Sequence, residues 1–171
     1  MKEMGFSLRG IASIYFRKNN KNKALEYYER ALTIDKKFGN KRNMGYSLSA
    51  MGACVSNEAG DNIKALEYLE RSLAIAEELG DKYWLSYSLY DIGFTYSFKG
   101  NDYRALEYYM RSLEIAKEID DDNIIGRSLK NIGGTYWEKG DLDIALDYFI
   151  NALEAFQRLG KDHHGHGDQR S

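Results

Sequence analysis

The chain has 171 residues, 24 basic and 26 acidic side chains and a formal net charge of −2. This balance excludes the basic excess of a nucleic-acid-binding surface, and no apolar run reaches the roughly 20 residues of a membrane-spanning helix. The absence of proline and a 43% apolar content favour helices in a globular fold. The lone Cys54 excludes an internal disulfide. We therefore expect a helical cytoplasmic protein that binds neither nucleic acid nor membranes.

One residue pattern recurs four times along the chain. Its leucine anchors are Leu8, Leu48, Leu89 and Leu129, at spacings of 40, 41 and 40 residues. A fixed period of this size indicates a solenoid whose repeating unit is a pair of helices. The expected helices are 3–18, 21–38, 42–58, 62–79, 83–98, 102–119, 123–138 and 142–159. They divide one domain, 1–160, into the repeats 4–40, 41–81, 82–121 and 122–160.

The first helix of each repeat has a small residue in the middle of its apolar face. Residues three, four and seven positions after each leucine share that face, and the central one is Ala12, Gly52, Gly93 or Gly133. A helical glycine costs about 1 kcal/mol relative to alanine. We therefore expect the glycines to allow close approach of the second helix.

The second helix of each repeat is apolar around much of its girth, which is typical of a helix that packs on two neighbours.

Turn residues agree with the proposed boundaries. The residues expected to end helices in the left-handed region are Asn19, Gly39, Gly60, Gly80, Gly100, Asp120, Gly140 and Gly160. The residues expected to open the following helices are Asn20, Asn40, Asp61, Asp81, Asn101, Asp121 and Asp141.

This pattern closely resembles the tetratricopeptide repeat, which has a large residue, Leu-Gly and Tyr in its first helix and Ala, an aromatic residue and Ala in its second. In the first copy these positions are Leu8, Ile11, Ala12, Tyr15, Ala24, Tyr28 and Ala31. Leucine replaces the usual tryptophan, the terminal proline is missing, and the period is about 40 rather than 34 residues. The chain is thereby similar to the long-repeat subclass, which includes adaptors, peptide-sensing regulators and sensor segments of bacterial kinases and cyclases.

The resemblance implies an all-α, right-handed solenoid that binds a protein or peptide segment in a concave groove lined by the first helices. The groove positions carried over from the family are Arg9, Ser13, Phe16, Ser49, Tyr87, Tyr90, Phe94, Arg127, Lys130 and Trp137. Aromatic and basic side chains together suit a segment of mixed apolar and acidic character. The chaperone-binding subclass is rejected, because only Arg9 matches the positions that hold its ligand's carboxylate.

No catalytic constellation is visible, so we predict no enzymatic activity, no cofactor and no metal site. The three histidines, His163, His164 and His166, all follow the last repeat, whereas a general base belongs inside the folded body. Residues 161–171 are expected to be a disordered tail or the start of a further repeat. Metal binding by these histidines is the less favoured alternative.

Two main interpretations of function remain open, and a purely structural, self-assembling array is a third. The first is a non-catalytic scaffold that binds a protein or peptide. The alternative is a regulatory or sensor domain of a multidomain signalling protein, such as a kinase, a cyclase or a transcription regulator.

The last helix carries the apolar residues Ile144, Ile150, Phe156 and Leu159, although terminal repeats usually need a polar outer face. We expect this apolar face to be covered by a further helix, by a parent domain or by a second copy of the chain. In the last case the protein would be a homo-oligomer.

Overall fold

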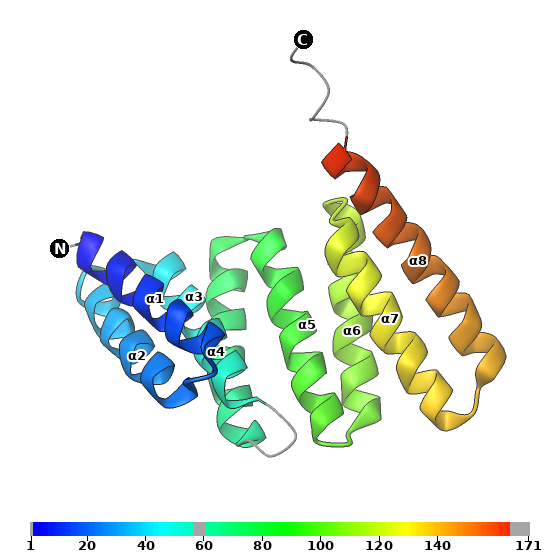
Figure 1. Ribbon diagram of the computed structural model, residues 1–171, viewed down its shortest axis with the longest axis horizontal. Coiled ribbons are helices and arrows are strands. Elements are labelled where there is room, and N and C mark those ends of the chain that lie inside the picture. The colour runs from blue at the N-terminus through cyan, green and yellow to red at the C-terminus, as the bar shows by residue number, and fades with distance from the viewer. Residues whose placement is uncertain (1, 57–60, 165–171) are drawn as a thin grey trace, which may run out of the picture.

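The computed structural model describes residues 2–56 and 61–164, which form helices joined by short turns and contain no strand. The helices are α1 Lys2–Arg17, α2 Lys21–Lys37, α3 Lys41–Val55, α4 Asn62–Leu79, α5 Lys82–Phe98, α6 Asp102–Glu118, α7 Asp122–Lys139 and α8 Leu142–His164. They form four antiparallel pairs that follow one another along the long axis of the molecule (Figure 1). The predicted all-α solenoid of four helix-turn-helix repeats is confirmed.

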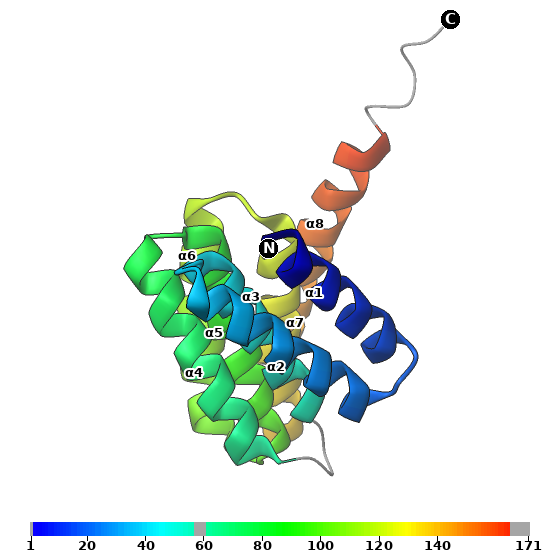
Figure 2. The same cartoon turned by 90° about the vertical axis from the view of Figure 1, so that its left-hand side faces the viewer.

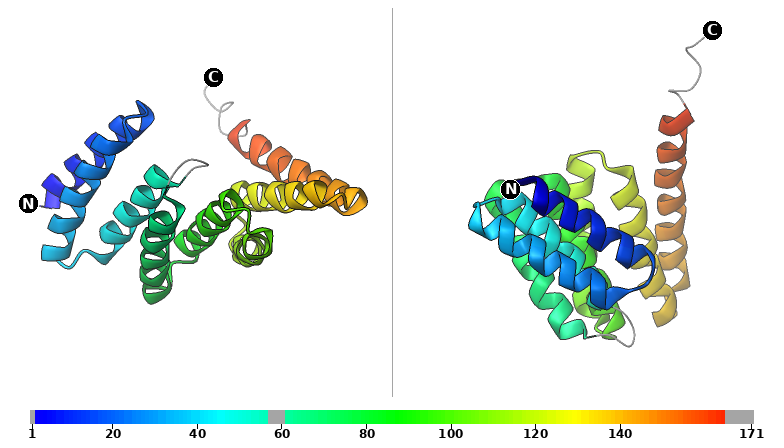
Figure 3. Two further views of the ribbon diagram at one scale, coloured as in Figure 1. Left: turned by 90° about the horizontal axis from the view of Figure 1, so that it is seen from below. Right: turned by 60° about the vertical axis from the view of Figure 1, so that its left-hand side comes forward.

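The row of helix pairs follows a curve (Figures 2 and 3). Each helix packs mainly on the helices before and after it in the chain. In addition, α3 contacts α5 and α5 contacts α7, whereas α2, α4, α6 and α8 make no comparable contact with one another in the described ranges. Because the first helices lie closer together than the second helices do, their exposed faces form a concave surface.

The helix boundaries arise from the expected turn residues. The side chains of Asn20, Asn40, Asp61, Asp81, Asn101 and Asp121 each accept a hydrogen bond from a backbone N–H in the first turn of the next helix. A positive φ is found at Asn19, Gly39, Gly80, Gly100, Asp120 and Gly140, as predicted. Gly60 lies outside the described residues.

The prediction for Gly160 was wrong, because α8 continues through it to His164. A helical glycine costs only about 1 kcal/mol, which the hydrogen bonds of an additional turn can offset. The expected tail thus overlaps helical residues 161–164, and residues 165–171 lie outside the described part of the chain.

In the second, third and fourth repeats, the small residue of the first helix lies where the second helix comes close. A Cβ atom added at Gly52 would lie 2.6 Å from Leu69 Cγ, and one at Gly93 would lie 2.9 Å from Tyr109 Cδ1. At Gly133 the nearest atom would be a backbone oxygen of α8, at 3.2 Å. The predicted close approach is therefore confirmed, and a Cβ at Gly52 or Gly93 would displace the neighbouring side chain.

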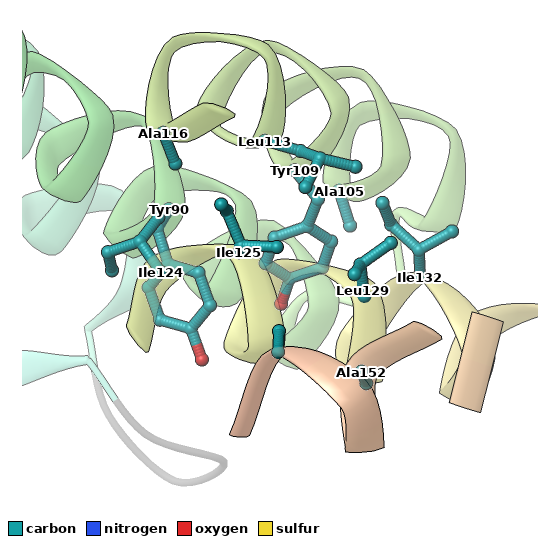
Figure 4. Close-up of a cluster of buried hydrophobic side chains, with 11 residues drawn as sticks. Tyr90, Ala105, Tyr109, Leu113, Ala116, Ile124, Ile125, Leu129, Ile132 and Ala152 are labelled. Atoms are coloured by element: carbon teal, nitrogen blue, oxygen red, sulfur yellow. The ribbon is translucent and has the colours of Figure 1, made fainter. Parts of the chain in front are cut away.

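The largest core cluster joins the third and fourth repeats. Tyr109 of α6 lies next to Ala105 and Leu113 of its own helix, and Ile125 and Leu129 of α7 pack against them (Figure 4). Tyr109 is 1% exposed. The second helix of a repeat is thus buried on two sides, as its wide apolar face indicated.

Replacing Gly93 by leucine is expected to lower the free energy of unfolding by about 1–3 kcal/mol, because the side chain overpacks the contact with Tyr109. Gly134→Leu is the matched control, since an added Cβ there meets nothing within 4 Å and replacing a helical glycine raises helix propensity. Denaturant unfolding followed by circular dichroism measures both. Equal effects of the two changes would contradict the close-approach argument.

Candidate functional site

Two hollows lie on the concave surface. Hollow I, with a volume of about 480 Å³, lies between α3 and α5 and includes the N-cap residue of α5. It is lined by Arg42, Tyr46, Ser49, Ala50, Ala53, Asp81, Tyr83, Trp84, Tyr87 and Asp91. Four aromatic and two alanine side chains make it a concave and largely apolar site with a few polar groups, as small binding sites usually are.

Hollow II, with a volume of about 270 Å³, lies farther along the groove between α5, α7 and the start of α8. It is lined by Phe94, Ser97, Tyr109, Lys130, Asn131, Gly134, Thr135, Trp137, Glu138 and Phe149. Phe94 is held in place by stacking on Tyr90, with ring centroids 6.2 Å apart, and by an edge contact with Phe98 at 4.7 Å. The hollow therefore has a fixed aromatic wall with Lys130 beside it.

Hydrogen bonds between neighbouring first helices form the floor of the groove. Ser56 and Thr95 join α3 to α5 through their hydroxyl oxygens, which are 3.0 Å apart. Asn131 Nδ2 on α7 donates to the Tyr90 hydroxyl on α5 at 2.9 Å. Asn123 Nδ2 donates to the Tyr87 hydroxyl at 3.0 Å. These side-chain bonds fix the spacing of the first helices, and hence the width of both hollows.

Asp91 is the charged group at the base of hollow I. It is partly buried, and its Oδ2 accepts a hydrogen bond from Ser49 Oγ at 3.4 Å. Burial raises the pKa of the Asp91 carboxyl to about 6, and the positive charge of Arg127 and the hydrogen bond from Ser49 oppose this shift only in part. Asp91 is therefore ionised at neutral pH, but its negative charge is incompletely compensated by its surroundings.

Three sequence models, all described as tetratricopeptide repeat, match residues 6–38, 40–118 and 126–165. Together they cover most of the chain. It belongs to the tetratricopeptide repeat family. No curated protein matches the sequence.

Solved structures with the same fold have low sequence identity to this tetratricopeptide repeat protein. A Rap protein in complex with competence and sporulation factor has a TM-score of 0.85 at 18% identity, over 94% of this chain and 45% of that one. Aspartyl phosphate phosphatase F from Bacillus subtilis has a TM-score of 0.87 at 16% identity, over 93% and 42%. MamA has a TM-score of 0.69 at 22% identity, over 92% and 81%. The chain thus spans less than half the length of the first and second of these.

Two groove residues predicted from the family are buried instead. Arg9 is 7% exposed and forms an ion pair with Asp35 of α2, so it does not offer a free guanidinium to the groove. Tyr90 is 4% exposed, because Phe94 and Tyr109 pack on it and Arg127 lies over its ring at 4.2 Å. The expectation of an exposed aromatic side chain at Tyr90 needs this correction.

The structure distributes the other predicted residues along the groove. Ser49 and Tyr87 line hollow I, while Phe94, Lys130 and Trp137 line hollow II. Ser13 is half-buried and Phe16 is exposed on α1, away from both hollows, and Arg127 lies on α7 above Tyr90. The structure thus brings five of the predicted residues together in two groups, and whether either group binds a ligand stays a prediction.

Sequence reasoning missed most of the lining of hollow I. Tyr46 occupies the position equivalent to Tyr87, two residues before the anchor leucine, so the repeat alignment contained a signal for it. Trp84 and Asp91 had no such signal, because their equivalents in the other repeats are different residues. Trp84 reaches hollow I by lying against Gly45, where an added Cβ would be 1.8 Å from the indole ring.

The outer face of α8 is apolar and exposed. Leu153 is 58% exposed, whereas its equivalent Leu113, which the next helix covers, is 9% exposed. Phe149 is 37% exposed against 1% for Tyr109. Trp137 and Phe149 line a further hollow of about 350 Å³ at this end of the array. Every internal second helix of this tetratricopeptide array packs on a following first helix, so the exposed face of α8 is that same packing surface.

Neither a metal cluster nor a membrane span is found in the part of the chain that the structure describes. No three potential ligands from His, Cys, Asp and Glu gather there, and none of its helices is long and apolar enough to cross a bilayer. The side chains of His163, His164 and His166 lie outside the described residues. Burial raises the pKa of the Cys54 thiol to about 11, which disfavours the reactive thiolate.

Replacing Asp91 by asparagine is expected to raise the melting temperature at pH 7 and above but to change it little near pH 4. The pKa of Asp91 is about 6 in the folded state against about 3.9 when exposed. Between these values the folded state binds more protons than the unfolded state, so the wild type loses stability as the pH rises through this window. Thermal unfolding of both proteins between about pH 4 and pH 8 measures the difference. A difference that does not vary with pH would contradict the assignment.

Proposed function

We propose that the chain is a non-catalytic scaffold, located in the cytoplasm, that binds an extended or helical protein segment in its concave groove. The observation that carries this proposal is the pair of aromatic hollows on one continuous concave surface, each with charged groups at its edge. Aromatic side chains in concave sites are typical anchors in protein interfaces. A Rap protein of the same fold forms a complex with competence and sporulation factor. This complex supports the proposal that a helical array of this kind binds another molecule.

The chemistry of the groove changes the segment expected from the sequence. The sequence predicts a segment of mixed apolar and acidic character, with its acidic residues attracted by Arg9, Arg127 and Lys130 in the groove. Arg9 is paired with Asp35, and Arg127 lies against an aromatic ring. Lys130 is exposed beside hollow II, so we place any acidic residue of the segment there and an apolar residue on Phe94.

A sensor domain of a larger signalling protein is the second candidate. The first two solved structures are more than twice as long as the matched region, and one is an aspartyl phosphate phosphatase. In such a protein the array would bind the signal and another domain would carry the activity. The groove has the same role in both candidates, so the same experiment tests its use.

Truncating Phe94 to alanine is expected to weaken binding by about 1–3 kcal/mol if this side chain is an anchor. The probe is a peptide enriched from a phage-displayed random library on the wild-type protein, and its affinity is measured by isothermal titration calorimetry. Because Phe94 faces a hollow and is 41% exposed, thermal unfolding should show that the variant remains folded.

Glu67→Ala on the exposed side of α4 is the control and should leave the affinity unchanged. Equal losses in both variants, or no loss in either, would mean that the peptide uses another surface. If the library yields no peptide above background, the groove does not bind free segments and the proposal fails.

We also propose that the apolar face of α8 pairs with the same face of a second copy. Its exposed residues Leu142, Leu146, Phe149 and Leu153 are spaced by four, three and four positions, which is the spacing of a helix-pairing seam. This spacing is the same in both directions along the helix. An antiparallel two-fold pairing would therefore place Leu142 opposite Leu153 and Leu146 opposite Phe149, as a self-complementary interface requires.

Replacing Leu153 by glutamate is expected to weaken self-association at least tenfold, because a charge would be buried at the seam. Sedimentation velocity over a range of concentrations measures the dimer fraction. Met110→Glu is the control, since Met110 is an exposed apolar residue on α6 at 42% exposure. A wild-type protein that stays monomeric at high concentration, or equal effects of the two changes, would contradict the pairing.

A further inference from the structure

We propose that hollow I binds a cationic group, a guanidinium or an ammonium, carried by the segment in the groove. The inference rests on the proposed function, because the segment brings this group to the hollow. It assigns the two hollows opposite preferences: a basic residue at hollow I and an apolar or acidic residue at hollow II. The bound segment would therefore have a defined direction along the groove.

The charges around hollow I leave one carboxylate without a partner. At its rim, Arg42 Nη1 lies 3.0 Å from Asp81 Oδ2, so these two charges compensate each other. Within the described residues, Asp91 has no cationic side chain within 4 Å and accepts only the hydrogen bond from Ser49. The negative charge of Asp91 is therefore only partly compensated at the base of the hollow, where it attracts a cation and repels a carboxylate.

The nearest cation of the protein does not fill this place. Arg127 lowers the pKa of Asp91 and so lies near enough to act on it electrostatically. Its guanidinium, however, lies 4.2 Å above the centre of the Tyr90 ring, on the side of α7. It makes no ion pair with Asp91, so the side of the carboxylate that faces hollow I remains available.

The walls of hollow I, like its base, favour a cation. Tyr83 and Tyr87 pack together with ring centroids 4.7 Å apart, and Tyr46 stands on the opposite helix with 57% of its surface exposed. Cations bind over aromatic faces because the ring quadrupole presents negative charge there. A carboxylate at the base and tyrosines on the sides match the charged head and the apolar stem of lysine or arginine.

A bare metal ion fits this site less well than an organic cation does. Divalent ions need several oxygen, nitrogen or sulfur ligands, and no three candidate ligands gather in the described part of the chain. The lining of hollow I is dominated by aromatic and alanine side chains. An organic cation uses this apolar surface, whereas a metal ion gains nothing from it.

The test compares peptides and protein variants in a double-mutant cycle. Peptides are enriched on the wild-type protein from a phage-displayed library, and the strongest binder is made with its basic residue replaced by citrulline or norleucine. An acetylated form distinguishes a side chain from the terminal amine as the cation. Each peptide is titrated against wild type, Asp91→Asn and the control Glu67→Gln, with thermal unfolding confirming that all three proteins are folded.

Enriched peptides should contain a basic residue, and Asp91→Asn should weaken binding of the basic peptide about tenfold, the factor that one charge-assisted contact supplies. The neutral peptide should bind Asp91→Asn and wild type equally, and Glu67→Gln should bind both peptides as wild type does. Enriched peptides without a basic residue, or the same loss for basic and neutral peptides, would overturn this inference while leaving groove binding intact. No enrichment at all would instead overturn the proposed function.

Discussion

The rest of the structure depends on the close contact between the two helices of each repeat. At Gly52 and Gly93 the second helix lies so near that no Cβ fits without displacing Leu69 or Tyr109. This contact holds the pair rigid and leaves the opposite side of the second helix free to pack on the next repeat. The first helices then lie close together on the inner side of the curve, and their outward faces become the groove.

The periodic part of the molecule could be predicted from the sequence because it repeats. Each cap, left-handed turn residue and core alanine appears several times, so one copy supports the assignment of another. The end of α8 could not be predicted in this way. Gly160 occupies a position where glycine ends the second helix in two other repeats, but α8 continues through it. A glycine is a weak predictor of a helix end, because a glycine inside a helix costs little free energy.

The groove was only partly predictable, because its residues differ from copy to copy and their environments differ too. Arg9, Ser49, Tyr90 and Lys130 occupy equivalent positions, yet they are respectively ion-paired, hydrogen-bonded, buried and exposed. The burial of Arg9 depends on Asp35 and on the space beside Gly5, where an added Cβ would lie 3.2 Å from Asp35 Oδ1. A position in the repeat thus gives the direction of a side chain but not its partner, which comes from another helix.

The residues proposed to bind a ligand occupy positions that do not repeat. A residue at a repeating core position is fixed by packing on both neighbours, so a change there affects stability first. No other repeat has a carboxylate at the position of Asp91, and burial raises the pKa of Asp91, so its ionised form at neutral pH reduces stability rather than adding to it. Packing does not require this carboxylate, and a neutral residue of the same size would suit the fold better. The folding of the array therefore does not explain its position at the base of an aromatic hollow, which is the observation that supports the proposed cation site.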